Sequence, residues 1–181
     1  MSDQDNELTR RDVIKLGAAA TAAVSLGVGH AEAQARVGGF LTDSEFAMLD
    51  ELSEIIIPTD NHSPGARAAK VAAFIDSQLA EAWEEKDRTD FRTGLALVER
   101  LSTDMNSAPF MKSSPEQRLA VLTRMAQNES KPEKPEEQFF KDLKGRVVYA
   151  YYTSEIGIKQ EMEYKGNTYQ TEFAGYDVSK Q

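Results

Sequence analysis

The chain has 181 residues, with 21 basic and 30 acidic side chains, a net charge of −9 and no cysteine. A chain this acidic lacks the positive surface that binds phosphate backbones or anionic lipid, so we expect no nucleic-acid partner. Without cysteine, the chain cannot form disulfides, thiolate zinc sites, iron–sulfur clusters, cysteine-linked c-type haem or thiol nucleophiles.

The N-terminus carries the pattern of a twin-arginine export signal. Residues Thr9–Lys15 read TRRDVIK, with Arg10 and Arg11 as the paired arginines, followed by an apolar run from Leu16 to Val28. That run has 13 residues, fewer than the roughly 20 needed to span a bilayer. The pattern therefore predicts a protein exported to the periplasm by the twin-arginine translocase.

A small-x-small cleavage site follows the apolar run. Ala31 and Ala33 are its two small residues, so we expect cleavage after Ala33 and a mature domain of residues 34–181. The removed segment holds three basic and five acidic side chains, which leaves 18 against 25 and a mature net charge of −7. The remaining 148 residues suit one domain with its own core. No second apolar run approaches membrane-spanning length, so we expect this domain to be soluble or peripheral to the inner membrane through its complex.

The first helix of the domain has a capping box at its start. Thr42 is placed to cap it, with Glu45 three residues later, and Pro58 ends it. We expect a second helix to begin at Ser63 and Pro64, because serine at the cap with proline next is a common helix start. Apolar side chains at helical spacing predict the buried faces of these two helices: Phe46, Leu49, Leu52, Ile55 and Ile56 in the first, and Val71, Phe74, Ile75, Gln78, Leu79, Ala82 and Trp83 in the second.

Three more helices are predicted along the rest of the chain. After a polar turn at 84–90, the third covers about 91–105, and the fourth starts with Ser114 as cap, Pro115 and Gln117. The fifth, about 136–154, is the most apolar, with Gly157 as its stop. The period then changes, so residues 162–173 predict a hairpin or an irregular tail. The fold class is therefore mainly α: a single compact helical domain of about five helices with a short irregular or hairpin C-terminal extension.

The sequence offers little catalytic chemistry. His30 lies in the signal, and His62 near Asp60 has no second histidine at ligand spacing. No Gly-x-Ser-x-Gly turn and no Gly-x-Gly-x-x-Gly motif is present. We therefore assign no catalytic, cofactor-binding or metal-binding residue.

The aromatic stretch near the end of the fifth helix is the most informative segment. Tyr149 and Tyr152 fall on one side of a helix and Tyr151 on another, so most of its circumference must be covered. The segment is either the central core helix or partly a docking face for a partner, and both roles can hold along its length.

Two sequence strings resemble the gluconate 2-dehydrogenase subunit 3 family. One runs from Tyr151 to Gly157 (YYTSEIG), preceded by Phe139-Phe140 and followed by Tyr164-x-Gly166-Asn167. The other joins Ile56–Asp60 with Ser63–Ala66. The similarity covers about residues 40–176, and a twin-arginine leader is usual in that family.

This resemblance implies a small subunit without a redox centre of its own. Its partner would be a large FAD-dependent flavoprotein of the glucose–methanol–choline (GMC) type, which oxidises gluconate or another sugar, and a multihaem cytochrome c is a candidate third subunit. The small subunit would supply the signal and carry the folded partner across the membrane. Its candidate interface consists of Tyr149, Tyr151, Tyr152, Thr153, Ser154, Glu155 and Gly157.

Two other functions stay open at this point. A periplasmic sugar-binding or scaffold module could stack sugar rings on Trp83 and the tyrosines. A stand-alone periplasmic enzyme could use carboxylates and His62. Turnover by the lone chain, or saturable sugar binding without a partner, distinguishes these from the accessory subunit.

Overall fold

Five α-helices form within residues 39–167, the part of the chain that the computed structural model describes, and no strand forms there. This confirms the mainly α prediction. The elements are α2 (Asp43–Ile56), α3 (Val71–Glu81), α4 (Glu85–Asn106), the 3₁₀ turn η1 (Phe110–Lys112), α5 (Pro115–Met125), α6 (Pro135–Tyr152) and the π-helical turn η2 (Gly157–Glu161). After η2 the backbone is irregular up to Asn167, and the rest of the predicted C-terminal extension lies outside the described residues.

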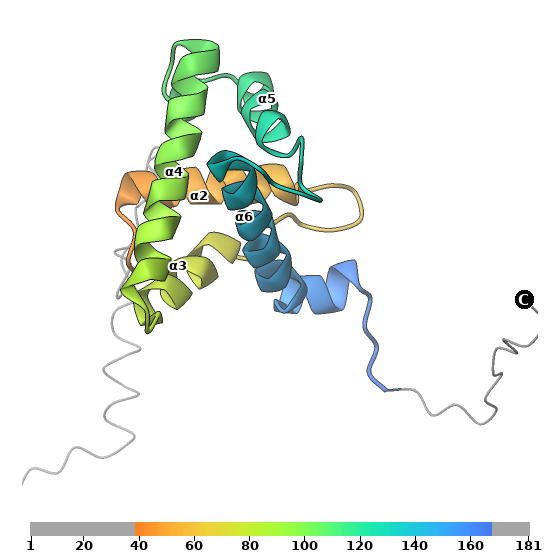
Figure 1. The fold of residues 1–181 in the computed structure, drawn as a ribbon. Coiled ribbons are helices and arrows are strands. Elements are labelled where there is room, and N and C mark those ends of the chain that lie inside the picture. Colours follow the sequence, from red (N-terminus) through yellow and green to blue (C-terminus); the bar gives the residue numbers. More distant parts are fainter. Residues whose placement is uncertain (1–38, 168–181) are drawn as a thin grey trace, which may run out of the picture. The chain divides into compact units, whose positions relative to one another are not determined.

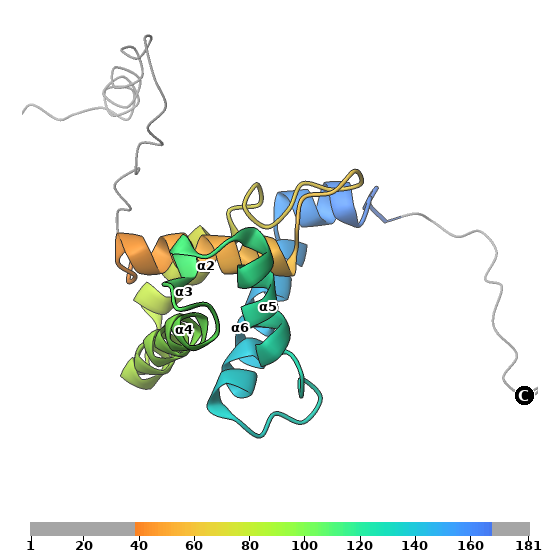
Figure 2. The same ribbon diagram turned by 90° about the horizontal axis from the view of Figure 1, so that it is seen from above.

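Helix α2 lies across α4 and α6, as the two perpendicular views show (Figures 1 and 2). Helix α5 packs on the same pair, while α3 packs against α2 and α6. The shared core is apolar and takes side chains from every helix; its fully buried members include Leu49, Leu52, Ile75, Leu79, Val98, Phe110, Val121, Leu143 and Tyr151. Removing this apolar surface from water drives the helices together.

The capping boxes predicted for α2 and α5 are both present. Thr42 accepts the backbone N–H of Glu45, and the Glu45 carboxylate accepts that of Thr42. Ser114 and Gln117 make the same reciprocal pair at the start of α5. Each box satisfies backbone donors that would otherwise lack partners in the first turn.

The predicted start of the second helix is wrong. Residues 66–70 form turns, and α3 begins only at Val71, after Lys70 adopts a left-handed φ of 56°. Ser63 does not cap a helix, because its hydroxyl contacts the Tyr151 hydroxyl instead. A tertiary contact therefore replaces the local cap.

The buried face predicted for this second helix is only partly right. Val71, Ile75 and Leu79 are buried, but Phe74 is 40% exposed, Gln78 is exposed and Trp83 is 99% exposed. Trp83 follows the helix instead of belonging to it, since α3 ends at Glu81.

Two further boundaries differ from the predictions. The polar run 84–90 is mostly helical, because α4 begins at Glu85. The carboxylates of Glu85 and Asp87 stabilise this start, since they lie in the first turn at the positive end of the helix dipole. Gly157 does not stop α6, which ends at Tyr152; the glycine instead begins the π-helical turn.

Candidate functional site

The loop of residues 58–66 and the end of α6 meet in what we call the Tyr151 junction. The Tyr151 side chain is 1% exposed, and its hydroxyl donates to the Pro64 carbonyl at 2.8 Å. The Ser63 hydroxyl oxygen lies 2.5 Å from the Tyr151 hydroxyl oxygen. Because the Tyr151 proton goes to Pro64, Ser63 is the donor in this second bond. A buried three-membered network thus joins residues 88 positions apart in the sequence.

Two glycines allow the backbone to approach closely on both sides of this junction. A Cβ added to Gly157 would lie 2.1 Å from the Tyr151 carbonyl oxygen. A Cβ on Gly65 would lie 2.4 Å from the Thr59 nitrogen. Neither neighbour is the end of a flexible side chain, so any larger residue must displace backbone. Both glycines are therefore structural requirements of the junction.

The 58–66 loop is held by carboxylates instead of by regular structure. The Asp60 carboxylate accepts the backbone N–H groups of His62 and Ser63, each at 2.8 Å. These two bonds lower the pKa of Asp60, the Ser63 bond contributing most. The carboxylate therefore serves the backbone of its own turn, as in an Asx turn, and does not orient the His62 ring for acid–base chemistry.

His62 connects the loop to η2. Its Nε2 lies 3.1 Å from the Glu161 carbonyl oxygen. This contact is the main cause that raises the pKa of His62, and the nearby Glu161 charge adds to it. Within residues 39–167, no group of three or more His, Asp or Glu side chains is placed to hold a metal ion.

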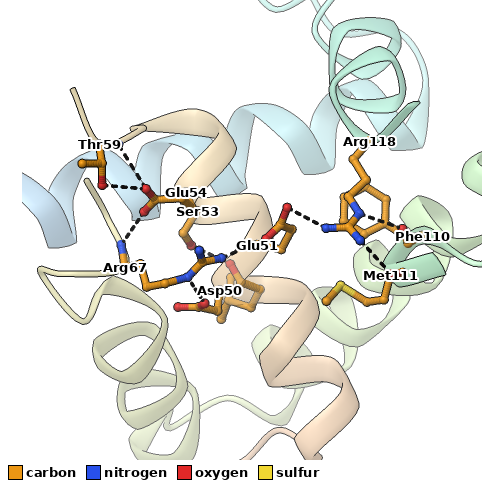
Figure 3. Close-up of polar contacts among 10 residues, drawn as sticks. Asp50, Glu51, Ser53, Glu54, Thr59, Arg67, Phe110, Met111 and Arg118 are labelled. Atoms are coloured by element: carbon orange, nitrogen blue, oxygen red, sulfur yellow. Dashed lines mark hydrogen bonds and ion pairs between the residues drawn. The ribbon is translucent and has the colours of Figure 1, made fainter. Parts of the chain in front are cut away.

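An ion-pair network fixes the other side of the loop on α2 (Figure 3). Glu51 bridges the guanidinium groups of Arg67 and Arg118, each at 2.8 Å, and Arg67 also binds Asp50 at 2.6 Å. Burial raises the pKa of Glu51, but the hydrogen bonds from Arg118 and Arg67 outweigh that effect and the net change is downward. Glu54 adds bonds to the backbone N–H groups of Thr59 and Arg67. The network ties α2, α5 and the loop together.

The residues of the predicted interface fall into two groups. Tyr151 and Gly157 are buried in the junction, and Ser154 is half-buried, with its hydroxyl bonded to the Tyr151 carbonyl. The exposed group comprises Tyr149, Tyr152, Thr153 and Glu155. The export-signal residues Arg10, Arg11, Ala31 and Ala33 lie outside the described residues.

The exposed tyrosines of α6 lie next to an exposed aromatic residue of α3. We call this surface, made of Phe74, Val148, Tyr149 and Tyr152, the aromatic face. Tyr149 is 58% exposed and Tyr152 37% exposed, and Val148, directly before Tyr149 on the same helix, is 37% exposed. The Phe74 ring of α3 packs on Tyr149 with ring centroids 6.2 Å apart. The helical spacing of Phe74 predicted a core residue, so its place on this face was not expected. The junction could not be predicted either, because no local pattern pairs Ser63 with Tyr151.

Comparison with known families places both strings of this junction in one family. The family model of gluconate 2-dehydrogenase subunit 3 matches residues 43–169, about 70% of the chain. The chain belongs to this family. A model of the twin-arginine translocation pathway signal matches residues 7–27. Searches of curated proteins and of solved structures gave no match.

Family membership confirms the resemblance seen in the sequence, and the signal directs export to the periplasm. The chain is thus an exported accessory subunit of the gluconate 2-dehydrogenase subunit 3 family. Among the helices within residues 39–167, none combines the length and apolarity needed to cross a bilayer.

Proposed function

We propose that this chain is a non-catalytic small subunit that binds, stabilises and co-exports the FAD-dependent large subunit of a periplasmic gluconate or sugar dehydrogenase. The partner is a GMC-type flavoprotein, and a multihaem cytochrome c is a third subunit in this proposal. FAD then belongs to the large subunit and haem to the third, while this chain holds no cofactor. The observation that carries the proposal is that one chain combines a dehydrogenase-subunit family domain with a twin-arginine signal.

The aromatic face is the docking surface in this proposal. It presents Phe74, Val148, Tyr149 and Tyr152 to solvent, on two helices whose opposite sides are fixed in the core. Aromatic side chains on a rigid support give large contact area with little loss of side-chain entropy, which favours them in protein interfaces. The partner in contact with this face is the large subunit, because the family is defined as one subunit of a larger enzyme.

Export of the partner tests the escort role directly. Replacing Arg10 and Arg11 by lysine should leave dehydrogenase activity in the cytoplasm, since the translocase recognises the arginine pair. Arg36→Lys is the matched control, because it makes the same change outside the signal. Fractionation followed by a dehydrogenase assay reports where the activity resides. Normal periplasmic activity in the double variant would contradict the proposal.

Docking has its own test. Tyr152→Ala should weaken assembly with the flavoprotein and leave the helix content of the free subunit unchanged, because this side chain is partly exposed on α6. Co-purification and circular dichroism measure the two effects. Loss of helicity in the variant would make Tyr152 a core residue and exclude it from the docking surface.

A further inference from the structure

Trp83 stands in the short connection between α3 and α4, and its side chain is 99% exposed. Tryptophan is on average highly buried, because its ring offers one of the largest apolar areas of any side chain. It is also among the residues most enriched at the energetic centres of protein interfaces. It is the only tryptophan of the chain, so its environment can be followed by fluorescence.

The connection that carries Trp83 is fixed at both ends. Leu79, on the last turn of α3, is 0% exposed, and Phe91 on α4 is 4% exposed. The Ala82 N–H bonds the Leu79 carbonyl at 3.3 Å, and the Asp87 N–H bonds the Glu84 carbonyl at 3.2 Å. The backbone that carries Trp83 is therefore fixed between two anchored helices. A segment whose backbone is already ordered loses less conformational entropy on binding than a mobile segment does.

The segment that carries this ring is acidic. Residues 81–90 contain five carboxylates and two basic side chains, a net charge of −3. One of the two basic side chains, Lys86, is already paired with Asp90. Both the face of an indole ring and a carboxylate attract guanidinium groups, the first by cation–π contact and the second by paired hydrogen bonds. The surface complementary to this corner is an apolar pocket lined by arginine.

We propose that Trp83 is a docking anchor that inserts into an arginine-lined apolar pocket of a protein partner. The inference rests on the proposed function, because the partner is the dehydrogenase large subunit, and it adds a second contact point to the aromatic face. Seven helical residues separate Phe74 from the end of α3 and two extended residues follow to Trp83, so their Cα atoms lie at most roughly 18 Å apart. One interface of ordinary size covers both positions.

Truncation of the ring tests this anchor. Trp83→Ala in the full chain should raise the Kd for the co-purified flavoprotein by at least about tenfold. The melting temperature of the free subunit should stay unchanged, since the side chain lies outside the core. Leu119→Ala is the matched control: it removes another exposed apolar side chain, on α5, and should leave the Kd unchanged.

Charge reversal tests the chemistry of the pocket. Glu84→Lys combined with Glu85→Lys should slow association and flatten its dependence on salt, because opposite charges steer encounter. If wild type binds the flavoprotein and Trp83→Ala binds within twofold of it, the anchor is wrong and the proposed function stands. If wild type captures no flavoprotein, the proposed function fails and the anchor fails with it. A saturable change in Trp83 fluorescence of the free chain with glucose or gluconate would assign the ring to a sugar and overturn the anchor.

Discussion

The hydroxyl of Tyr151 offers a direct test of the junction. Tyr151→Phe removes one oxygen and keeps the ring, so packing changes little. It deletes the 2.8 Å bond to the Pro64 carbonyl and the 2.5 Å contact with Ser63. A neutral hydrogen bond contributes about 1 kcal/mol, and a buried group left without its partner costs more. Ser63 retains the Pro64 carbonyl, 3.4 Å away, as an acceptor. We therefore expect the free energy of unfolding to fall by about 2 kcal/mol.

Tyr152→Phe is the matched control on the adjacent position. Its hydroxyl lies 3.4 Å from the Glu161 carboxylate at an exposed site, so its removal should change stability by less than about 0.5 kcal/mol. Urea unfolding followed by circular dichroism gives both values, and the slope with denaturant should be unchanged because the exposed area is the same. Equal losses in the two variants, or a loss under about 0.5 kcal/mol for Tyr151→Phe, would refute the argument.

Three further substitutions probe other parts of the fold. Asp76→Ala should lower stability by about 3 kcal/mol in thermal unfolding, because its buried carboxylate accepts two backbone N–H groups at the start of the domain; an unchanged melting temperature would contradict this. Gly94→Ala should destabilise despite its better helix propensity, since the new Cβ would lie 1.9 Å from the Phe139 ring; a stability gain would show that the ring moves freely. Glu137 accepts the backbone N–H of Glu133, the main cause that lowers its pKa below 4.5. Its contribution is present above that value and lost as pH falls through the lower folded pKa, so the stability difference from Glu137→Gln should shrink in acid and stay constant near neutrality.

Local chemistry was enough to predict most helices. The capping boxes of α2 and α5 each lie within four consecutive residues, so the sequence contains all the atoms that decide those starts. The apolar spacing of α6 likewise reflects its own buried stripe, from Phe139 to Tyr151. Where one short segment supplies both donor and acceptor, the sequence predicts the structure.

Long-range contacts decided the features that the sequence did not predict. Ser63 and Pro64 have the pattern of a helix start, but Tyr151 binds both from the far end of the chain. The polar run 84–90 resembles a loop because its side chains face solvent, although its backbone is largely helical. Apolar spacing also predicted Trp83 on the buried face of the second helix. Periodicity alone does not show that this helix ends before Trp83 and leaves its side chain exposed.

The two family strings now have a physical explanation that separates stability from docking. Tyr151 and Gly157 come from one string and Ser63 to Gly65 from the other, and together they build the buried junction. That junction joins the last turn of α6 and the first residue of η2 to the 58–66 loop. The exposed side chains beside it, Tyr149 and Tyr152, take no part in its hydrogen-bond network, although the Tyr152 ring packs edge-on against the Tyr151 ring. Substitutions inside the junction should therefore reduce stability before they affect assembly, whereas substitutions on the aromatic face should reduce assembly more than stability.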